Sequence, residues 1–317
     1  MAMSDSYEPY TLGKILMEAL KLLPKSMKLT FPISIFTFVY SSSLFITNTS
    51  YTSPLLQDLT SKLLLILNKE PNGPLGPGFM DNLIAIGKDL KQLIIIEAIS
   101  SFVSFIIVLL LLISLAYTFS TAYSDKPLSV KGLVKIIDKR WYETLITKLY
   151  IVLLSLGYGV FMGSIIGVVM LITKSSNLSM SLAYFALCLY IYLFTRWQLS
   201  LLVTVNEKAY GLGALSEAVI LYIGNMKIGC AITYLALLVQ CAIYGAFLFI
   251  QKSMKVDNLI GIELGFLALS LMWNIYILAV YTVYYFECRK SHGIVDHEEG
   301  DQSYFKYWSL LPSTTKV

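Results

Sequence analysis

Residues 195–227 read TRWQLSLLVTVNEKAYGLGALSEAVILYIGNMK, and this stretch decides the fold. Its first part, up to Val205, ends a long apolar segment, which the polar residues Asn206, Glu207 and Lys208 interrupt. A run of small and apolar residues follows, and Lys227 precedes the next apolar segment. Two apolar segments joined by a short polar break are typical of neighbouring membrane spans, so the stretch predicts a helical membrane protein.

The composition of the whole chain agrees with this prediction. Its 317 residues are 56% hydrophobic and 14% charged, and the mean hydropathy is +0.69, well above that of soluble domains. Most Lys and Arg residues flank apolar runs, whereas a nucleic-acid surface would interleave basic and aromatic residues on a soluble face. We therefore expect no nucleic-acid partner. The cysteines lie inside or just after apolar segments, so no disulfide framework is expected: Cys188, Cys230, Cys241 and Cys288.

Six segments are apolar for long enough to cross the roughly 30 Å hydrocarbon core of a bilayer. The predicted fold class is therefore all-α, a polytopic helical membrane bundle of six transmembrane helices with additional interfacial amphipathic helices. No charged residue occurs between 98 and 124, which makes the second span the least ambiguous. We expect a cytosolic N-terminal segment at 1–28, a membrane domain at 29–286 and a cytosolic tail at 287–317, with spans at about 29–47, 98–121, 150–173, 179–205, 228–250 and 263–286.

Two segments outside the spans have the spacing of amphipathic helices. Residues 12–23 are expected either on the membrane surface or packed on the protein's own cytosolic loops. Residues 125–148 combine an apolar stripe with basic residues and predict an interfacial helix, as a site for anionic lipid headgroups or merely as an orientation signal. The stripe is Leu133, Ile136, Ile137 and Trp141, and the basic residues are Lys126, Lys131, Lys135, Lys139, Arg140 and Lys148.

Glycines mark two predicted close contacts between helices. Gly159, Gly163 and Gly167 are spaced by four residues in the third span, which leaves one helix face without side chains. We expect this face to pack against another helix of the same bundle, with a dimer contact as the alternative. After the polar break, Gly211 and Gly213 begin a helix of small residues that is expected to pack tightly beneath the spans.

Arg196, Trp197 and Glu207 are predicted at the membrane interface. An arginine at the bilayer centre costs about 2.5 to 3.5 kcal/mol on the insertion scale, and less near the edge. The apolar residues 184–195 are long enough to place Arg196 near the headgroups, and Trp197 suits the same depth. We therefore expect Arg196 to snorkel toward the interface, with a buried functional arginine as the alternative.

Gln240 and Asn274 fall near the middle of the fifth and sixth spans. In antiparallel neighbours they lie at similar depth, and we predict a hydrogen bond between them worth about 0.6 to 2 kcal/mol. A solute pathway is the alternative interpretation of the same pair. Transporters usually carry intramembrane charges or helices broken at midspan, and neither feature is clear in this sequence.

The distribution of basic residues predicts the orientation. With both termini in the cytosol, sixteen of the 24 Lys and Arg residues lie in inner segments and seven in outer ones, leaving Arg196 aside. The positive-inside rule therefore favours cytosolic termini, in an endomembrane such as the endoplasmic reticulum or in the plasma membrane. The Asn-x-Ser sequons at Asn48 and Asn177 fall on the outer side, but so close to the membrane that we do not expect modification.

The sequence contains no recognisable catalytic constellation. Phosphate-binding Gly-Lys-Ser loops, HExxH motifs and paired intramembrane carboxylates are absent, and no serine has a suitable histidine partner. His292 and His297 are the two histidines, and they lie in an acidic tail that is expected to be solvated rather than metal-binding. We therefore expect no catalytic residue, no cofactor, no metal and no enzyme activity.

Three blocks carry a resemblance to a known family. DKPLS at 125–129, RWQLSLLVTVNEKAYGLGAL at 196–215 and YYFECRKSHG at 284–293 resemble a family of plant six-span membrane proteins, some labelled polyadenylate-binding-protein-binding. More distantly, the block from Trp197 to Leu215 is similar to the membrane domain that accompanies some bacterial glycerophosphodiester phosphodiesterases. Plant members tend to have Glu-Pro before the Tyr-Gly, and Lys208 stands here in place of the proline. The resemblance implies six spans and transfers no catalytic residue.

These observations lead to a functional expectation. The chain is expected to be a noncatalytic integral membrane protein, a membrane-organising component that binds lipid or protein partners through its basic cytosolic helices. Its expected partners are the lipid bilayer, anionic lipid headgroups and other membrane proteins. The alternative is a transporter or lipid-handling protein that uses the bundle interior around Gln240 and Asn274.

Overall fold

The computed structural model describes residues 11–68, 79–173, 176–207, 209–253 and 259–293. Within these residues every regular element is a helix, which confirms the predicted all-α class. The elements are α1 (Leu12–Thr47), the π-helical η1 (Asn48–Thr52), α2 (Ser53–Asn68), α3 (Phe79–Tyr123), α4 (Val130–Thr173), α5 (Ser176–Asn206), α6 (Leu212–Tyr222), α7 (Met226–Ser253) and α8 (Leu259–Ser291).

Six helical segments of the described chain are long and apolar enough to cross a membrane: α1 continued into α2, then α3, α4, α5, α7 and α8. The protein is thus a multi-pass membrane protein, as predicted. Helices suit this setting because hydrocarbon supplies no hydrogen bonds, so each span must satisfy its own backbone groups. The helices are longer than the predicted spans. The 45 residues of α3, for example, measure about 68 Å at 1.5 Å per residue.

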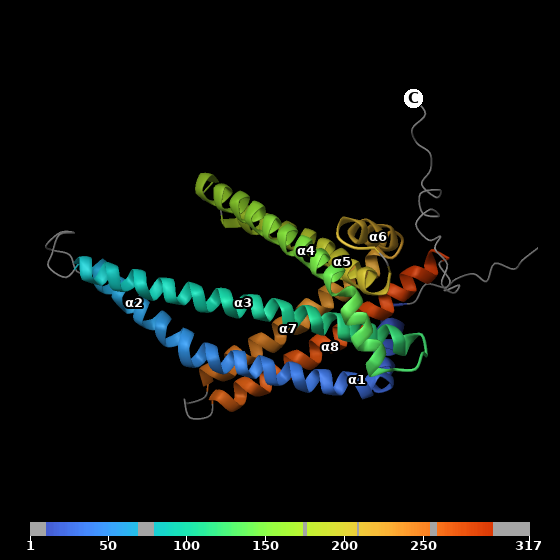
Figure 1. Ribbon diagram of the computed structural model, residues 1–317. Helices are drawn as coiled ribbons and strands as arrows, with labels where there is room; N and C mark the ends of the chain where they lie inside the picture. Colours follow the sequence, from blue (N-terminus) through green and yellow to red (C-terminus); the bar gives the residue numbers. More distant parts are fainter. Residues whose placement is uncertain (1–10, 69–78, 174–175, 208, 254–258, 294–317) are drawn as a thin grey trace, which may run out of the picture.

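The long helices lie side by side with alternating direction (Figure 1). Helix α1 packs between α3 and α8, α7 packs against α8, and α4 pairs with α5. Short α6 packs on α5 and also contacts α4 and α8. In Figure 1 the α4–α5 pair lies close to α3 near α6 and separates from it with distance from α6.

The two ends of the bundle differ in packing. We call the end that holds the start of α1, the α3–α4 connection, α6 and the end of α8 the α6 end, and the opposite one the far end. Buried side chains concentrate at the α6 end, where they form one continuous core that includes Ile15, Phe119, Leu202 and Tyr281. At the far end large apolar side chains face outward, and Leu171 and Phe249 are 80% and 73% exposed.

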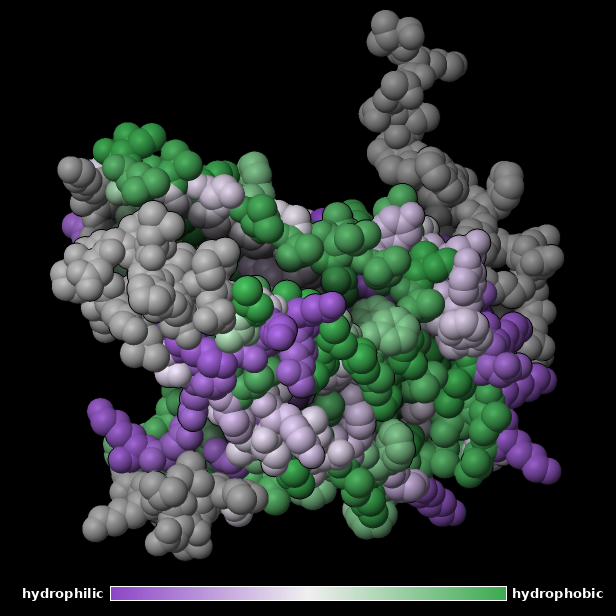
Figure 2. Space-filling view, turned by 60° about the vertical axis from the view of Figure 1, so that its left-hand side comes forward, coloured by the Kyte–Doolittle hydropathy of each residue, from purple (hydrophilic) through white to green (hydrophobic). Residues whose placement is uncertain are grey.

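Apolar side chains cover much of the molecular surface, and in Figure 2 the hydrophilic residues form smaller patches among them. An exposed apolar surface of this extent would be unstable in water, because soluble proteins rarely expose contiguous apolar patches larger than a few hundred Å². The surface therefore fits contact with lipid rather than with water.

The first turns of α1 decide between the two positions expected for residues 12–23. Ile15, Ala19 and Leu22 are at most 3% exposed and belong to the core at the α6 end. This apolar face packs on the protein, as in the second alternative, but its contacts are with the helices α3 and α8 rather than with loops. The predicted span from residue 29 is the continuation of the same helix, and both Pro24 and Pro32 lie inside it.

Candidate functional site

The break after α5 is held against α4 by a glycine. Gly211 has φ +59°, and its N–H donates a hydrogen bond of 2.8 Å to the Thr147 hydroxyl on α4. A Cβ at Gly211 would lie 3.4 Å from side-chain atoms of Ile146 and Tyr150, so the predicted close packing is present at this position. Gly213 differs, because nothing lies within 4 Å of its Cβ position, and the packing predicted there is wrong.

Hydroxyl groups join the helices at the α6 end. Thr147 on α4 bonds to Thr204 on α5 at 3.0 Å. Thr195 on α5 bonds to Thr233 on α7, whose hydroxyl lies 2.7 Å from the Tyr281 hydroxyl on α8. All these threonines are completely buried. Hydrogen bonds of this kind hold membrane helices together, and no pattern in the sequence marks these threonines.

Gly229 makes the closest approach between helices in this region. A Cβ there would lie 2.5 Å from the Tyr284 hydroxyl and 2.9 Å from side-chain atoms of Thr195 and Tyr222. Only a glycine fits without displacing these neighbours. The packing of α7 on α5, α6 and α8 therefore depends on this position.

Glu207 is the centre of a charged cluster where α5, α6 and α8 meet. The Tyr285 hydroxyl donates a 2.6 Å hydrogen bond to Glu207 Oε1, and Arg289 Nε lies 3.9 Å from the same oxygen. Glu217 reaches the cluster from α6. Its pKa is raised to about 8, first by burial and then by a hydrogen bond with, and repulsion from, Glu207, while Arg289 acts in the opposite direction. The structure thus places the predicted interfacial Glu207 beside groups from α6 and α8.

A second cluster, beside the first on α8, joins this helix to the end of α3. Tyr123 donates to Glu287 at 2.9 Å, and Lys290 donates to both Tyr123 at 2.7 Å and Glu287 at 2.9 Å. The Tyr123 ring stacks on Phe286 with 4.6 Å between centroids. Glu287 is only 3% exposed, so its hydrogen bonds are needed to compensate for its burial.

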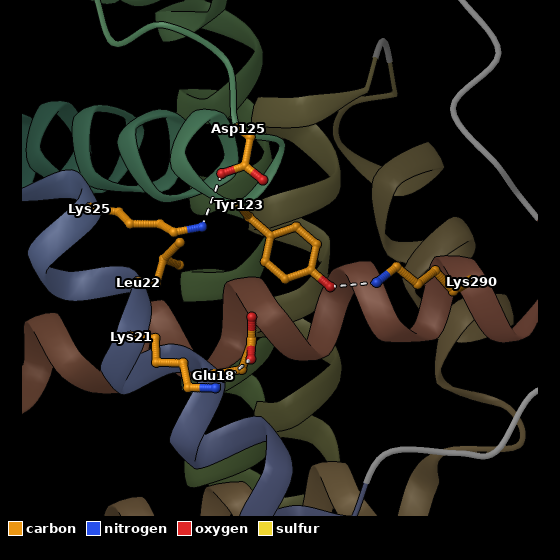
Figure 3. Close-up of a pocket in the computed structure, with 7 residues that line it drawn as sticks. All are labelled: Glu18, Lys21, Leu22, Lys25, Tyr123, Asp125 and Lys290. Atoms are coloured by element: carbon orange, nitrogen blue, oxygen red, sulfur yellow. Dashed lines mark hydrogen bonds and ion pairs between the residues drawn. The ribbon is translucent and has the colours of Figure 1, made fainter.

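Tyr123 and Lys290 also line a pocket of about 260 Å³ between α1, α3 and α8. Figure 3 shows Lys25 pointing across it toward Asp125, with Lys21 and Glu18 on the next turn of α1. Lys25 Nζ lies 3.0 Å from the Asp125 carboxylate, and Lys21 lies 3.9 Å from Glu18. Because positive and negative groups are paired within the pocket, it has no strong preference for an anion.

Asp125 adopts an unusual backbone conformation at the edge of this pocket. Its φ is +52°, and the Lys126 N–H bonds to the Thr121 carbonyl, which is the hydrogen bond of a Schellman motif that ends α3. Glycine is usual at such a position. The aspartate places a carboxylate within reach of Lys25 instead.

The first half of α4 presents an exposed row of lysines. Lys131, Lys135 and Lys139 recur every four residues and are all exposed. The opposite face, with Ile136 and Ile137, packs against the core. Beside the lysines lies an exposed apolar row in which Val130 is 62%, Val134 60% and Trp141 46% exposed. Arg140 is not part of the exposed row, because it is buried and paired with Glu143.

Arg196 and Trp197 occupy different environments from each other. Arg196 is half-buried, with its guanidinium 5.4 Å from the centroid of the Tyr192 ring one turn back on α5. Trp197 is 5% exposed and packs edge-on against Tyr190. Both line a second pocket, of about 360 Å³, whose other walls are Leu154, Tyr158, Leu193 and Leu215. Trp197 is thus in the packing between α4 and α5, and its depth at the membrane interface stays a prediction.

The predicted hydrogen bond between Gln240 and Asn274 is absent. Gln240 Nε2 donates to the Ser270 hydroxyl at 3.0 Å, and Asn274 Nδ2 donates to the Ser270 backbone carbonyl at 2.9 Å. The register of α7 on α8 brings Ser270 and Trp273 toward α7, since the Trp273 indole N–H bonds to the Ala236 carbonyl. Asn274 is the next residue around the helix and is exposed.

The glycine face of α4 is also not used as predicted. Gly159, Gly163 and Gly167 are exposed, and nothing lies within 4 Å of a Cβ at any of them. Helix α5 packs on another face of α4, where the Tyr158 hydroxyl bonds to the Ala186 carbonyl. The expected packing inside the bundle is therefore wrong for these glycines.

In the part of the chain that the structure describes, no group of three or more His, Cys, Asp or Glu side chains is arranged to hold a metal. His292 caps the end of α8, with Nδ1 2.8 Å from the Cys288 carbonyl. His297 and its acidic neighbours lie outside the described residues. The Cys288 thiol is completely buried.

Comparisons with known proteins give one match. No curated protein and no solved structure matches this chain. A family model described as "Domain of unknown function (DUF8558)" matches residues 7–306, which is nearly the whole chain and includes all six candidate spans. The resemblance to plant six-span proteins and to the phosphodiesterase membrane domain stays a prediction. On the strength of the family-model match, the chain belongs to the DUF8558 family.

Proposed function

We propose that this protein is a noncatalytic membrane component whose α6 end binds the anionic headgroups of one leaflet, and that it organises partner proteins there. The observation that carries the proposal is the exposed surface of residues 130–141 on α4, hereafter the α4 interface. Three lysines form one row on this surface, and Val130, Val134 and Trp141 form the adjacent row.

Two adjacent rows of this kind suit the boundary between headgroups and acyl chains. The apolar row can enter the acyl boundary while the lysines remain among the headgroups. Each lysine near an anionic membrane surface contributes about 1 kcal/mol. The third face of the helix is already buried against the protein core, so the α4 interface is held at a fixed angle to the bundle.

The charge distribution supports a cytosolic position for this end. Lysines of α1, the α4 interface and the end of α8 gather there, and the positive-inside rule assigns such segments to the cytosol. Both termini are then cytosolic. The cytosolic leaflet also carries most of the anionic lipid, so the same orientation supplies the proposed ligand.

Transport through the bundle interior is less well supported. It depended on Gln240 and Asn274, and Asn274 is exposed and bonds to the Ser270 carbonyl of its own helix rather than to Gln240. Neither residue lines either pocket described above.

The proposal is tested by replacing the lysine row. The variant Lys131→Gln/Lys135→Gln/Lys139→Gln and the native full chain are purified in mild detergent, and the Tm is measured with added phosphatidylserine or phosphatidylcholine. We expect phosphatidylserine to raise the native Tm more than phosphatidylcholine does, and the variant to lose at least about half of that difference.

The matched control is Lys88→Gln/Lys91→Gln/Lys252→Gln, which removes three exposed lysines at the far end. It should keep the full difference between the two lipids. An equal loss in both variants would show a general charge effect, and no loss in the first would contradict the proposal.

A further inference from the structure

The second pocket combines apolar walls with one cationic group. Its walls come from three helices, with Leu154 and Tyr158 on α4, Leu193 and Trp197 on α5, and Leu215 on α6. The Tyr158 hydroxyl is already bonded to the α5 backbone, so it adds no free polar group to the wall. Arg196 supplies the charge.

Arg196 lacks an acidic partner in the described part of the chain. It is the only charged residue in α5, and α4 carries none between 150 and 173. Its observed contacts are a 3.4 Å hydrogen bond to the Tyr192 hydroxyl and the face of the Tyr192 ring. An arginine on a membrane-spanning helix is usually paired with an acid or functional, and here the described residues offer only the Tyr192 side chain.

The pocket lies at the depth of the headgroups. Arg196 follows the start of α5 by 20 residues, which corresponds to about 30 Å of helix, the thickness of the hydrocarbon core. Leu154 precedes the end of α4 by 19 residues and is therefore at about the same depth. The apolar walls extend from this level toward the bilayer centre along α4 and α5.

We propose that this pocket binds one anionic phospholipid, with the headgroup phosphate at the Arg196 guanidinium and an acyl chain along Leu154 and Leu193. A guanidinium binds phosphate through paired charge-assisted hydrogen bonds. Trp197 lines the same pocket, and its indole N–H is the second donor that we assign to the headgroup. The inference deepens the proposed function and rests on it for the anionic character of the facing leaflet.

This site differs from the α4 interface in its stoichiometry. The lysine row is exposed and can exchange many headgroups, whereas the Arg196 pocket accommodates one lipid chain. Native mass spectrometry of the full chain distinguishes the two sites. The chain is first delipidated and then incubated with equal amounts of phosphatidylserine and phosphatidylcholine. We expect the native protein to retain one phosphatidylserine at collision energies that remove the others.

Two variants test the two halves of the pocket. Arg196→Gln should lower occupancy by that retained lipid about tenfold, because it removes the charge-assisted hydrogen bonds. Leu154→Trp leaves Arg196 intact and fills the space for the acyl chain, and it should lower occupancy by a similar factor. Arg196→Lys keeps the charge without the planar fork and should retain an intermediate occupancy.

Folding and the proposed function are controlled separately. The Tm values of the delipidated variants should lie within about 2 °C of the native value, which excludes a merely structural effect. The triple lysine variant should keep the retained lipid. If that variant keeps the lipid and shows the same difference in Tm between phosphatidylserine and phosphatidylcholine as the native chain, the proposed function is contradicted. The assignment of the Arg196 pocket is then still supported.

Several results would overturn the inference itself. These are full retention of phosphatidylserine by Arg196→Gln, equal retention of phosphatidylcholine by the native chain, or displacement of the phospholipid by an equimolar amount of oleate. The last result would assign the pocket to a fatty-acid carboxylate instead.

Discussion

The α6 end and the far end of the bundle are made of the same helices but packed in different ways. At the α6 end, buried threonines and tyrosines hydrogen-bond between helices, and a glycine allows the closest contact. At the far end, the described residues of α4 beyond Ile151 and of α7 beyond Thr233 include no buried side chain. The far halves of α4 and α7 therefore face the surroundings far more than their other halves do.

This difference shows which interactions hold the protein together. In hydrocarbon, apolar side chains gain little by leaving lipid for protein, so Leu and Phe alone do not close a bundle. What holds membrane helices together is close approach at small residues and hydrogen bonds between helices. Both are concentrated at the α6 end, and the variants below test that concentration from the largest expected effect to the smallest.

Gly229→Val should have the largest effect. Its side chain would collide with Tyr284, Thr195 and Tyr222, and overpacking of this kind destabilises by roughly 3 kcal/mol. Thermal unfolding of the purified chain in mild detergent measures the loss. A native-like Tm would show that α7 can move aside, and the close contact at Gly229 would then not be needed for packing at the α6 end.

Tyr285→Phe should be next, at about 2 kcal/mol, because it removes the donor of a hydrogen bond to the partly buried carboxylate of Glu207. Tyr244→Phe is the matched control, since Tyr244 lies in the far half of α7 and is 60% exposed. Unfolding midpoints of the two variants are compared. Equal losses would mean that the Glu207 cluster contributes nothing specific.

A smaller effect is expected from pH at the same cluster, because Glu217 is only partly buried and solvent screens much of its interaction with Glu207. The folded chain holds the Glu217 proton up to a pKa of about 8, compared with 4.5 for an ordinary glutamate. The folded state therefore binds more protons than the unfolded state between these values, and stability falls as pH rises from 5 to 8. In Glu217→Gln the Tm should depend less on pH over this window. An unchanged slope in that variant, or an equally flat slope in Glu18→Gln in the first turns of α1, would assign the pH dependence to other groups.

Gly163→Val should have the smallest effect, below about 0.5 kcal/mol, because its Cβ position is open. The change is made in the same detergent as Gly229→Val, so the two glycines compare the two ends directly. A loss as large as that of Gly229→Val would show that the far half of α4 is packed against something, and the contrast between the ends would disappear.

The sequence predicted the all-α class and the six spans because apolar length is a local property of the chain. It did not predict which face of a helix meets its neighbour. Asn274 and Trp273 are adjacent in sequence, and the rotation of α8 decides that Trp273 and not Asn274 bonds to α7. The packing predicted for the glycine face of α4 was wrong for the same reason, because α5 packs on the face that carries Tyr158.

The charged cluster around Glu207 shows a second limit. Glu207 was identified from the polar break, but its partner Tyr285 is 78 residues away in sequence. Tyr285 and Arg289 stand one helical turn apart at the end of the last span, and this spacing is the only local signal that they act together. Pairing across helices depends on the arrangement of the spans in space, which a single sequence does not contain.

One further consequence comes from the length of α3. Glu97 is the last charged residue before its uncharged stretch, and the predicted span begins at residue 98, so the 19 residues from Phe79 to Glu97 amount to about 28 Å of helix outside that predicted span. Helix α2 runs beside them, and Lys62 joins Asp58 and Asp89 at 2.7 and 2.6 Å. The second of these ion pairs connects α2 to α3. It joins α2 to the part of α3 that lies outside the predicted span, so the end of α3 does not stand alone there.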